Sequence, residues 1–171
     1  MSDRATEDSP GIRARVVHPD EWELWRELRL RSLADSPDAF GSTLEREQGF
    51  TEADWRQRLQ SVAVVATVDG VPAAMGGGFQ VREGWMLVIA MWTDPAYRGR
   101  GLSRKVLDVV VAAARGQGLR LVLNVTRGST AARRAYERYG FEATGESEPL
   151  RPGSDVVTDL MVLPEPPTRA D

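Results

Sequence analysis

The chain alternates between two patterns of apolar side chains. Short apolar runs bounded by turn residues are typical of β-strands, and they lie at 12–17, 62–68, 71–81, 86–92, 119–125, 141–147 and 156–163. Apolar side chains recur instead at three- and four-residue steps, the period of a helix, at 19–34, 102–115 and 129–139, and a further short helix is predicted to begin after Thr51. The order β, α, α, β, β, β, α, β, α, β, β indicates an α+β fold with a mixed sheet rather than a doubly wound one.

The connections between these segments constrain the sheet. Asp69-Gly70 predicts a tight hairpin between the second and third strands. The fourth strand, the long helix after it and the fifth strand imply a parallel pair with a right-handed crossover. Three consecutive glycines, Gly76-Gly77-Gly78, interrupt the third strand and predict a bulge or a close approach of another backbone.

The length of 171 residues suits one domain, which we place at 11–163. The polar ends, 1–10 and 164–171, are expected to be disordered tails.

Composition excludes several classes of partner and site. A net charge of −3 and a pI near 5.3 argue against a nucleic-acid partner, which usually requires a basic surface. Cysteine is absent and His18 is the single histidine, so we expect no disulfide, no cysteine nucleophile and no metal site. The sequence has no apolar run of the ~20 residues that cross a bilayer, and its polar start is unlike a signal peptide. We therefore predict a cytoplasmic protein without a membrane partner.

The segment 94–105 joins the fourth strand to the long helix and carries the clearest chemical signal. Gly99 and Gly101 permit an unusual backbone path, and the first amides of a helix have no intrahelical partners, so the loop can present N–H groups to an anion. Basic residues surround it, at positions 98, 100, 104 and 105. The dinucleotide pattern G-x-G-x-x-G fails because Arg104 stands at its last glycine, and the triphosphate loop fails because no Ser or Thr follows Lys105. A phosphate or pyrophosphate loop and a basic turn facing solvent both remain as interpretations.

Two motifs together resemble a known family. Arg98 and Gly101 match the pattern [Q/R]-x-x-G-x-[G/A], with Ser103 at its last position. The pattern N-x-x-A-x-x-x-Y-x-x-x-G-F is matched by Ala132, Tyr136, Gly140 and Phe141, with Ser129 in place of the asparagine. Over residues 12–163 the chain therefore resembles the GNAT superfamily, the acyl-CoA-dependent N-acyltransferases. Without the resemblance, Tyr136 would also be read as a core aromatic on an amphipathic helix.

The resemblance implies a fold and a cofactor site. The fold would be a mixed, mostly antiparallel sheet of about seven strands, split between strands 4 and 5 and flanked by about four helices. The pantetheine arm of acetyl-CoA would enter the split beside a bulge in strand 4, with its pyrophosphate on the glycine loop. The residues expected to contact acetyl-CoA are Met91, Trp92, Thr93, Arg98, Gly99, Arg100, Gly101, Leu102, Ser103, Arg104, Asn124, Ser129 and Tyr136.

The implied reaction is attack of a neutral amine on the thioester in a ternary complex. Tyr136 is the expected general acid, since a phenol with a pKa of about 10 holds its proton at neutral pH while a thiol has a pKa of about 8.5. Backbone amides near Trp92 would polarise the thioester carbonyl. No carboxylate lies inside strand 4, so a water chain through Asn124 is the preferred route for the amine proton.

We expect an N-acetyltransferase that modifies a primary amine of a small molecule. Acetylation of a protein N-terminus or lysine, and a non-catalytic acyl-CoA sensor, are the alternatives. The acceptor side would include Trp25, Phe40, Ser42 and Thr43, although tryptophans of a first helix also suit a core. The resemblance leaves a homodimer open.

Overall fold

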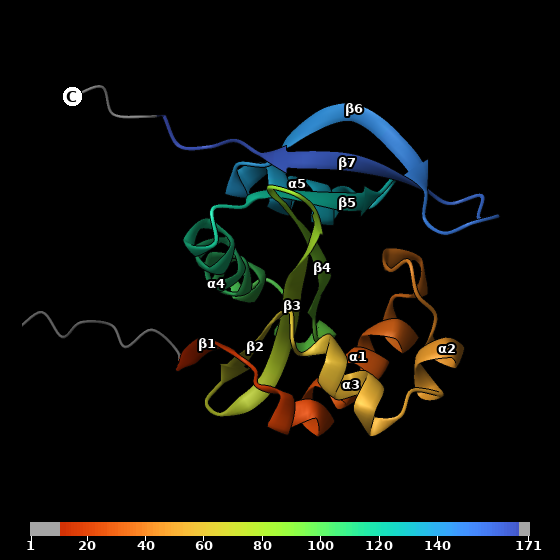
Figure 1. The fold of residues 1–171 in the computed structure, drawn as a ribbon, viewed down its shortest axis with the longest axis vertical. Helices are drawn as coiled ribbons and strands as arrows, with labels where there is room; N and C mark the ends of the chain where they lie inside the picture. The colour runs from red at the N-terminus through yellow and green to blue at the C-terminus, as the bar shows by residue number, and fades with distance from the viewer. Residues whose placement is uncertain (1–10, 168–171) are drawn as a thin grey trace, which may run out of the picture.

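The structure, a computed structural model, describes residues 11–167 as one seven-stranded sheet with helices on both faces (Figure 1). The strands are β1 (Ile12–Val16), β2 (Val62–Val68), β3 (Val71–Arg82), β4 (Trp85–Thr93), β5 (Arg120–Thr126), β6 (Glu142–Pro149) and β7 (Val157–Leu163). The α-helices are α1 (Trp22–Asp35), α2 (Leu44–Gln48), α3 (Glu52–Arg58), α4 (Leu102–Gly116) and α5 (Thr130–Tyr139). Short 3-10 helices lie at η1 (Pro19–Glu21), η2 (Pro37–Ala39) and η3 (Pro95–Tyr97).

The strand order is β1-β2-β3-β4-β5-β7-β6. Only β4 and β5 are parallel among the paired strands of the described residues, and the other neighbours are antiparallel. The mixed, mostly antiparallel sheet and the α+β class are therefore confirmed. The residues 1–10 and 168–171 of the predicted tails lie outside the described residues.

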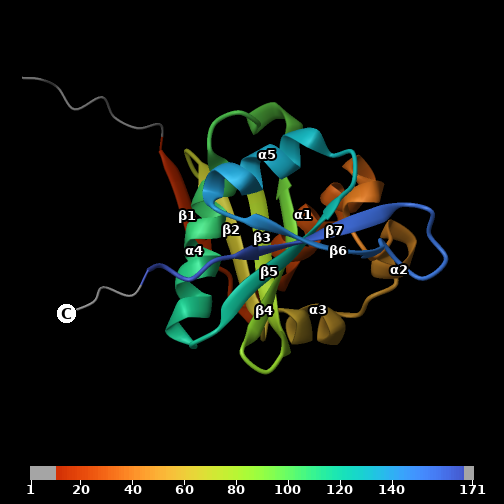
Figure 2. The same cartoon turned by 90° about the horizontal axis from the view of Figure 1, so that it is seen from above.

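Two cores form because each strand directs alternate side chains to opposite faces. On one face, apolar residues of the strands pack under α4, together with Phe141. On the other face, Trp25, Leu28 and Leu33 of α1 and Trp55 of α3 cover the sheet. Figure 2 shows α4 on one side of strands β1 to β4 and α1 and α3 on the other. No described helix combines the length and the apolar character needed to cross a membrane.

The sheet splits between its two parallel strands. The pairing of β4 with β5 covers only Trp85–Val88 and Arg120–Leu123. Beyond Val88, β4 remains paired with β3 while β5 continues with β7. The edge of β4 that faces β5 therefore has unpaired backbone groups from Ile89 to Thr93, and these groups need other partners.

A bulge in β4 lies at this split. Ala90 has a φ of 57°, and the β3–β4 register shifts between Met75 and Gly77. Met86 and Val88 pack in the core under α4, whereas Trp92 packs in the core under α1. One extra residue thus reverses the alternation of the strand. The reversal turns Met91 toward α4 and Trp92 toward α1.

The three glycines of β3 accommodate this bulge and its neighbours. A Cβ on Gly76 would overlap the sulfur of Met91 and approach Val106 Cγ1 to 2.7 Å. A Cβ on Gly78 would lie 2.6 Å from the sulfur of Met86. The predicted close approach of another backbone is found at Gly77, where a Cβ would meet the carbonyl oxygen of Val62, whereas side chains approach Gly76 and Gly78. The extra residue of the bulge belongs to the neighbouring strand β4.

The helix between η2 and α3 is absent from the sequence prediction. Residues after Phe40 look like a connector, yet Thr43 caps α2 by accepting a hydrogen bond from the amide of Arg46 at 3.3 Å. Five residues are too few to show a helical period, and Glu47 of α2 is anchored by a buried ion pair with Arg29. The capping of α3 was predictable, because Thr51 and Asp54 hydrogen-bond each other reciprocally.

Candidate active site

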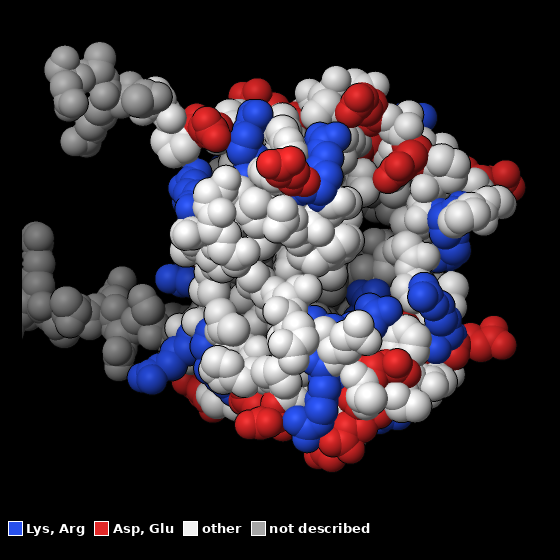
Figure 3. All heavy atoms as spheres, in the orientation of Figure 1, with Lys and Arg blue, Asp and Glu red and all other residues white. Residues whose placement is uncertain are grey.

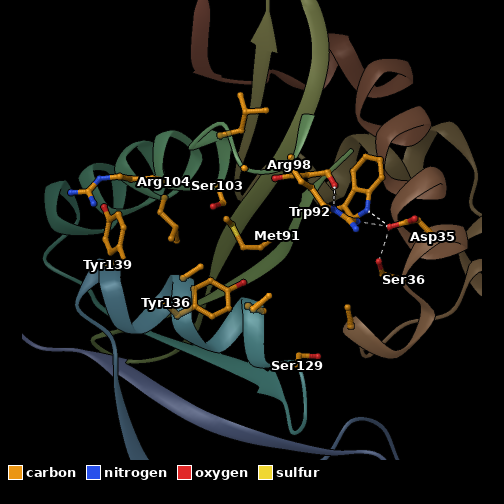
Figure 4. Close-up of a pocket in the computed structure, with 18 of the residues that line it drawn as sticks. Asp35, Ser36, Met91, Trp92, Arg98, Ser103, Arg104, Ser129, Tyr136 and Tyr139 are labelled. Atoms are coloured by element: carbon orange, nitrogen blue, oxygen red, sulfur yellow. Dashed lines mark hydrogen bonds and ion pairs between the residues drawn. The ribbon is translucent and has the colours of Figure 1, made fainter. Parts of the chain in front are cut away.

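A cavity of about 930 Å³ lies where β4 and β5 separate. Its walls come from four places: the 35–40 segment after α1, the end of β4, the glycine loop with the start of α4, and α5 (Figure 4). Figure 3 shows the face of the molecule hollowed between the β5–β7–β6 part and the α1–α2 part, with acidic and basic side chains intermixed around it. The cavity therefore reaches elements from both faces of the sheet.

The glycine loop ends in the N-terminus of α4. Gly99 has a φ of 80° and Gly101, the N-cap residue, has a φ of 77°. A Cβ at either position would meet open space, so backbone conformation rather than crowding favours glycine there. The first intrahelical bond of α4 is made by Lys105, which leaves the preceding amides free for an anion. Leu102, Ser103 and Arg104 line the cavity at this end.

Tyr136 enters the cavity from α5. Its hydroxyl points toward Met91 (Figure 4), and it has no hydrogen bond to another described residue. The ring packs edge-on against Phe141 with 6.0 Å between ring centroids. Burial raises the pKa of Tyr136 to about 12, so the phenol keeps its proton at neutral pH.

The bulge positions two successive residues of β4 differently. Met91 extends into the cavity, while the side chain of Trp92 is 6% exposed and turned toward the end of α1. The side chain of Trp92 is thus largely withdrawn from the split, on whose edge its backbone groups lie. Thr93 lines the cavity, and its carbonyl accepts a hydrogen bond from Arg98 Nε at 3.0 Å.

The carboxylate of Asp35 collects three donors at the wall of the cavity. Its Oδ2 atom accepts hydrogen bonds from Trp92 Nε1 at 3.0 Å, Ser36 Oγ at 2.8 Å and Arg98 Nη2 at 2.7 Å. The hydrogen bond from Trp92, followed by those from Ser36 and Arg98, holds the pKa of Asp35 below its usual value. Arg98 thus points toward α1, although its place in the motif suggested a contact with phosphate.

Basic and aromatic side chains border the end of the cavity opposite Asp35 (Figure 4). Arg104 lies over the ring of Tyr139 with its Cζ 5.8 Å from the ring centroid, and Arg138 also lines the cavity. The hydroxyl of Tyr139 donates to Asp108 at 2.8 Å, and burial together with this bond raises the pKa of Tyr139. Ser129 occupies the N-cap position of α5 without a side-chain capping hydrogen bond, and it lines the cavity.

Most residues expected at the cofactor site meet in this cavity: Met91, Trp92, Thr93, Arg98, Gly99, Gly101, Leu102, Ser103, Arg104, Ser129 and Tyr136. Of the expected acceptor-side residues, Phe40 also lines it. Arg100 lies outside, with its Cζ 5.2 Å from the ring centroid of Tyr97.

Four further predicted site residues lie elsewhere. Asn124 faces a separate hollow lined by strands β5, β6 and β7, where its Nδ2 donates to Glu148 at 3.2 Å. Trp25 belongs to the core under α1. Ser42 and Thr43 precede α2, and neither lines the cavity.

The cavity also contains residues that the sequence analysis did not assign to a site: Asp35, Ser36, Pro37, Asp38, Ala39, Tyr97, Leu107, Thr130, Ala131, Ala132, Ala135, Arg138 and Tyr139. Helical spacing could have identified part of this set, because Ala132, Ala135 and Tyr139 share a face with Tyr136. No local pattern indicates a site role for Asp35, because its partners Trp92 and Arg98 lie 57 and 63 residues further along the chain.

Within residues 11–167, no group of three or more His, Cys, Asp or Glu side chains could hold a metal ion.

Comparisons with known proteins agree on one family. The model of the Acetyltransferase (GNAT) family matches residues 22–141. A mycothiol acetyltransferase of Thermobispora bispora is 32% identical over 146 residues, covering 80% of this chain and 48% of that protein. An acetyltransferase of Agrobacterium fabrum is 33% identical over 74 residues, covering 43% of this chain and 53% of that protein. The chain spans about half the length of these curated relatives.

Solved structures show the same fold. The structure of yncA from Salmonella typhimurium with its cofactor acetyl-CoA has a TM-score of 0.72 to this chain at 18% sequence identity. The similarity covers 91% of this chain and 96% of that one.

Proposed function

The chain belongs to the GNAT acetyltransferase family, and we propose that it transfers the acetyl group of acetyl-CoA to a primary amine of a small molecule. The amine attacks the thioester directly in a ternary complex. The observation that carries this proposal is that Tyr136, the unpaired edge of β4 and the N-terminus of α4 meet in one cavity at the split of the sheet.

The residues of the cavity suit acetyl-CoA. The free amides at the start of α4 and the positive φ angles of Gly99 and Gly101 suit the pyrophosphate of CoA. Pantetheine carries amide groups, and the backbone of Met91 and Trp92 lies on the edge of β4 that no longer pairs with β5. Arg104 and Arg138 supply positive charge at the same end of the cavity as the loop.

Tyr136 supplies the proton that the reaction needs. When bound, acetyl-CoA contributes an activated acetyl group and a thiol leaving group. The phenol of Tyr136 is protonated at neutral pH, its hydroxyl faces the cavity, and it has no competing partner among the described residues. It can therefore deliver its proton to the departing sulfur. Backbone N–H groups of β4 beyond the bulge act as fixed donors to the carbonyl oxygen.

The proposal includes no protein base for the amine. Asp35 lines the cavity and accepts a hydrogen bond from Trp92, but its three donors and lowered pKa make it a weak proton acceptor. Asn124 lies outside the cavity, so the water relay expected through it is not retained. The amine would enter in its neutral form, the proton that its nitrogen loses as the amide forms would pass to solvent, and Tyr136 would regain from solvent the proton that it gives to the sulfur.

A small acceptor is favoured by two hydrogen bonds that cross the acceptor side. Thr126 Oγ on β5 donates to the carbonyl of Asp38 at 2.7 Å. Arg151, in the β6–β7 connection, donates to the carbonyl of Phe40 at 3.0 Å. These bonds tie the 35–40 segment, which is one wall of the cavity, to β5 and to the β6–β7 connection, and so limit the space that an extended polypeptide would need.

The test is release of free thiol from acetyl-CoA in the presence of a panel of small amines and, separately, of peptides with free N-termini and lysines. Amine-dependent thiol release with the small amines, accompanied by the acetylated product in a mass spectrum, is expected. Turnover with the peptides alone would show that the acceptor is a polypeptide and not a small molecule. Binding of acetyl-CoA with no turnover on either panel would indicate a sensor instead of an enzyme.

A further inference from the structure

The carboxylate of Asp35 connects three elements at the wall of the cavity. It ends α1, contacts the β4 segment beyond the bulge through Trp92, and contacts the first residue of the glycine loop through Arg98 (Figure 4). Arg98 extends the connection by donating to the carbonyl of Thr93. A single oxygen atom therefore joins the acceptor-side helix to both parts of the expected cofactor site.

We propose that Asp35 is a positioning residue for the acetyl-CoA site, holding the bulged end of β4 and the glycine loop in register with α1. This inference rests on the proposed function, because it concerns how that same site is preformed. Asp35 acts through Trp92 and Arg98 and touches no reacting atom.

The strength of the connection comes from its combination of partners. The side chains of Arg98 and Asp35 are 51% and 31% exposed, and an ion pair at such exposure is weak when it stands alone. The same oxygen also receives the indole N–H of Trp92, whose side chain is buried in the core under α1. Packing fixes the indole of Trp92, and its N–H orients the carboxylate of Asp35. The carboxylate in turn orients the exposed guanidinium of Arg98.

A second connection runs parallel to this one. Arg31, one turn earlier in α1, pairs with Asp94 and lies with its Cζ 5.4 Å from the ring centroid of Trp92. The end of α1 thus keeps one attachment to the loop when Asp35 is changed. Loss of the Asp35 carboxylate should alter the local geometry without unfolding the chain.

The experiment follows the indole N–H signals in ¹H–¹⁵N NMR spectra of the full chain. The sequence has five tryptophans, and a Trp92→Phe variant identifies the signal of Trp92. Asp35→Asn removes the charge with little change of shape. Glu21→Gln is the matched control, because Glu21 forms a two-bond ion pair with Arg15, at 2.9 and 2.6 Å, at the opposite end of α1 and away from the cavity.

Asp35→Asn is expected to move the Trp92 indole signal in the free protein and to weaken CoA binding, measured by calorimetry, by about threefold to tenfold. Glu21→Gln should change neither. Arg98→Gln should weaken CoA binding by a similar factor, and the double variant should bind no more weakly than the worse single variant, since both remove one interaction.

An unmoved Trp92 signal in Asp35→Asn would overturn the hydrogen-bonded connection. A moved signal with unchanged CoA affinity would overturn the positioning role, as would full additivity in the double variant. Absence of CoA binding by the unmodified protein would overturn the proposed function and the role of Asp35 in it, while the indole signal of the free protein still decides whether the connection exists.

Discussion

At the residue scale, the proposed chemistry depends on Tyr136. The two GNAT-like motifs allowed this residue to be predicted from the sequence, and helix periodicity alone would have assigned it to the core. The structure explains both interpretations, because the ring packs on Phe141 while the hydroxyl faces the cavity. Asp35 could not be predicted in this way, since its partners come from a strand and a loop that only the folded chain brings to it.

Tyr136→Phe should lower kcat by about tenfold or more, the usual range for loss of a general acid, with little change in acetyl-CoA affinity. Steady-state kinetics with the best amine and calorimetry with acetyl-CoA measure the two effects. Tyr139→Phe is the matched control, because it removes a hydroxyl from the same helix that is bonded to Asp108. An unchanged kcat in Tyr136→Phe at saturating substrates would remove this residue from the mechanism.

At the element scale, the bulge in β4 and the glycine loop define the site. The apolar runs and the helical spacing predicted all seven strands and four of the five α-helices of the described residues. The bulge in β4 was expected from the resemblance and not from the pattern, since β4 is apolar from Trp85 to Trp92 and buries residues on both faces. The short helix α2 was missed because its stability comes from tertiary contacts.

Replacement of Gly101 by valine should weaken acetyl-CoA binding strongly. A β-branched residue is strained at a φ of 77°, so the first turn of α4 would have to rearrange and its amides would move. Gly116→Ala is the control, because Gly116 ends the same helix without a positive φ. Calorimetric titration compares the two variants. Equal acetyl-CoA affinities would argue against the loop as the binding site for pyrophosphate.

At the scale of the whole molecule, two cores on opposite faces of one sheet leave the split between β4 and β5 as the opening. The order of elements was sufficient to predict the mixed sheet, and the resemblance to GNAT proteins supplied the split. The hydrogen bonds that Thr126 and Arg151 donate across the acceptor side could not be predicted from local sequence. Each joins two residues that are far apart in the chain, by 88 positions for Thr126 and by 111 positions for Arg151.

The buried ion pair between Arg29 and Glu47 should dominate the stability of the α1–α2 region. Glu47 is fully buried, and Arg29 donates to it from Nε and Nη2 at 2.9 Å each. Glu47→Ala would leave the guanidinium buried without its partner and should lower the free energy of unfolding by about 3–5 kcal/mol. Urea denaturation measures the change. Glu52→Ala breaks an exposed pair with Arg56 in the neighbouring helix α3 and should change the free energy of unfolding little. Equal losses of unfolding free energy in the two variants would refute the difference expected between the buried and the exposed pair.

Alkaline pH should destabilise the protein partly through Tyr136. Its pKa is raised to about 12 in the folded chain, so above a pH of about 10 the unfolded chain releases this proton first and becomes favoured. Stability from this group is present below the unfolded pKa and is lost as the pH rises through the folded value. Tyr136→Phe should therefore lose less stability than the unmodified protein between a pH of about 9 and 11 in urea titrations. Equal losses of stability in the variant and in the unmodified protein would show that burial does not raise the pKa of Tyr136.

The proposed function requires that acetyl-CoA bind in the cavity at the split of the sheet with its sulfur beside Tyr136. A crystal structure of the full chain with CoA tests this placement most directly. We expect pyrophosphate oxygens on the amides of Leu102 to Arg104, pantetheine along Met91 to Thr93, and the CoA sulfur within hydrogen-bonding reach of the Tyr136 hydroxyl. CoA bound outside the cavity, or bound there with its sulfur directed away from Tyr136, would contradict it.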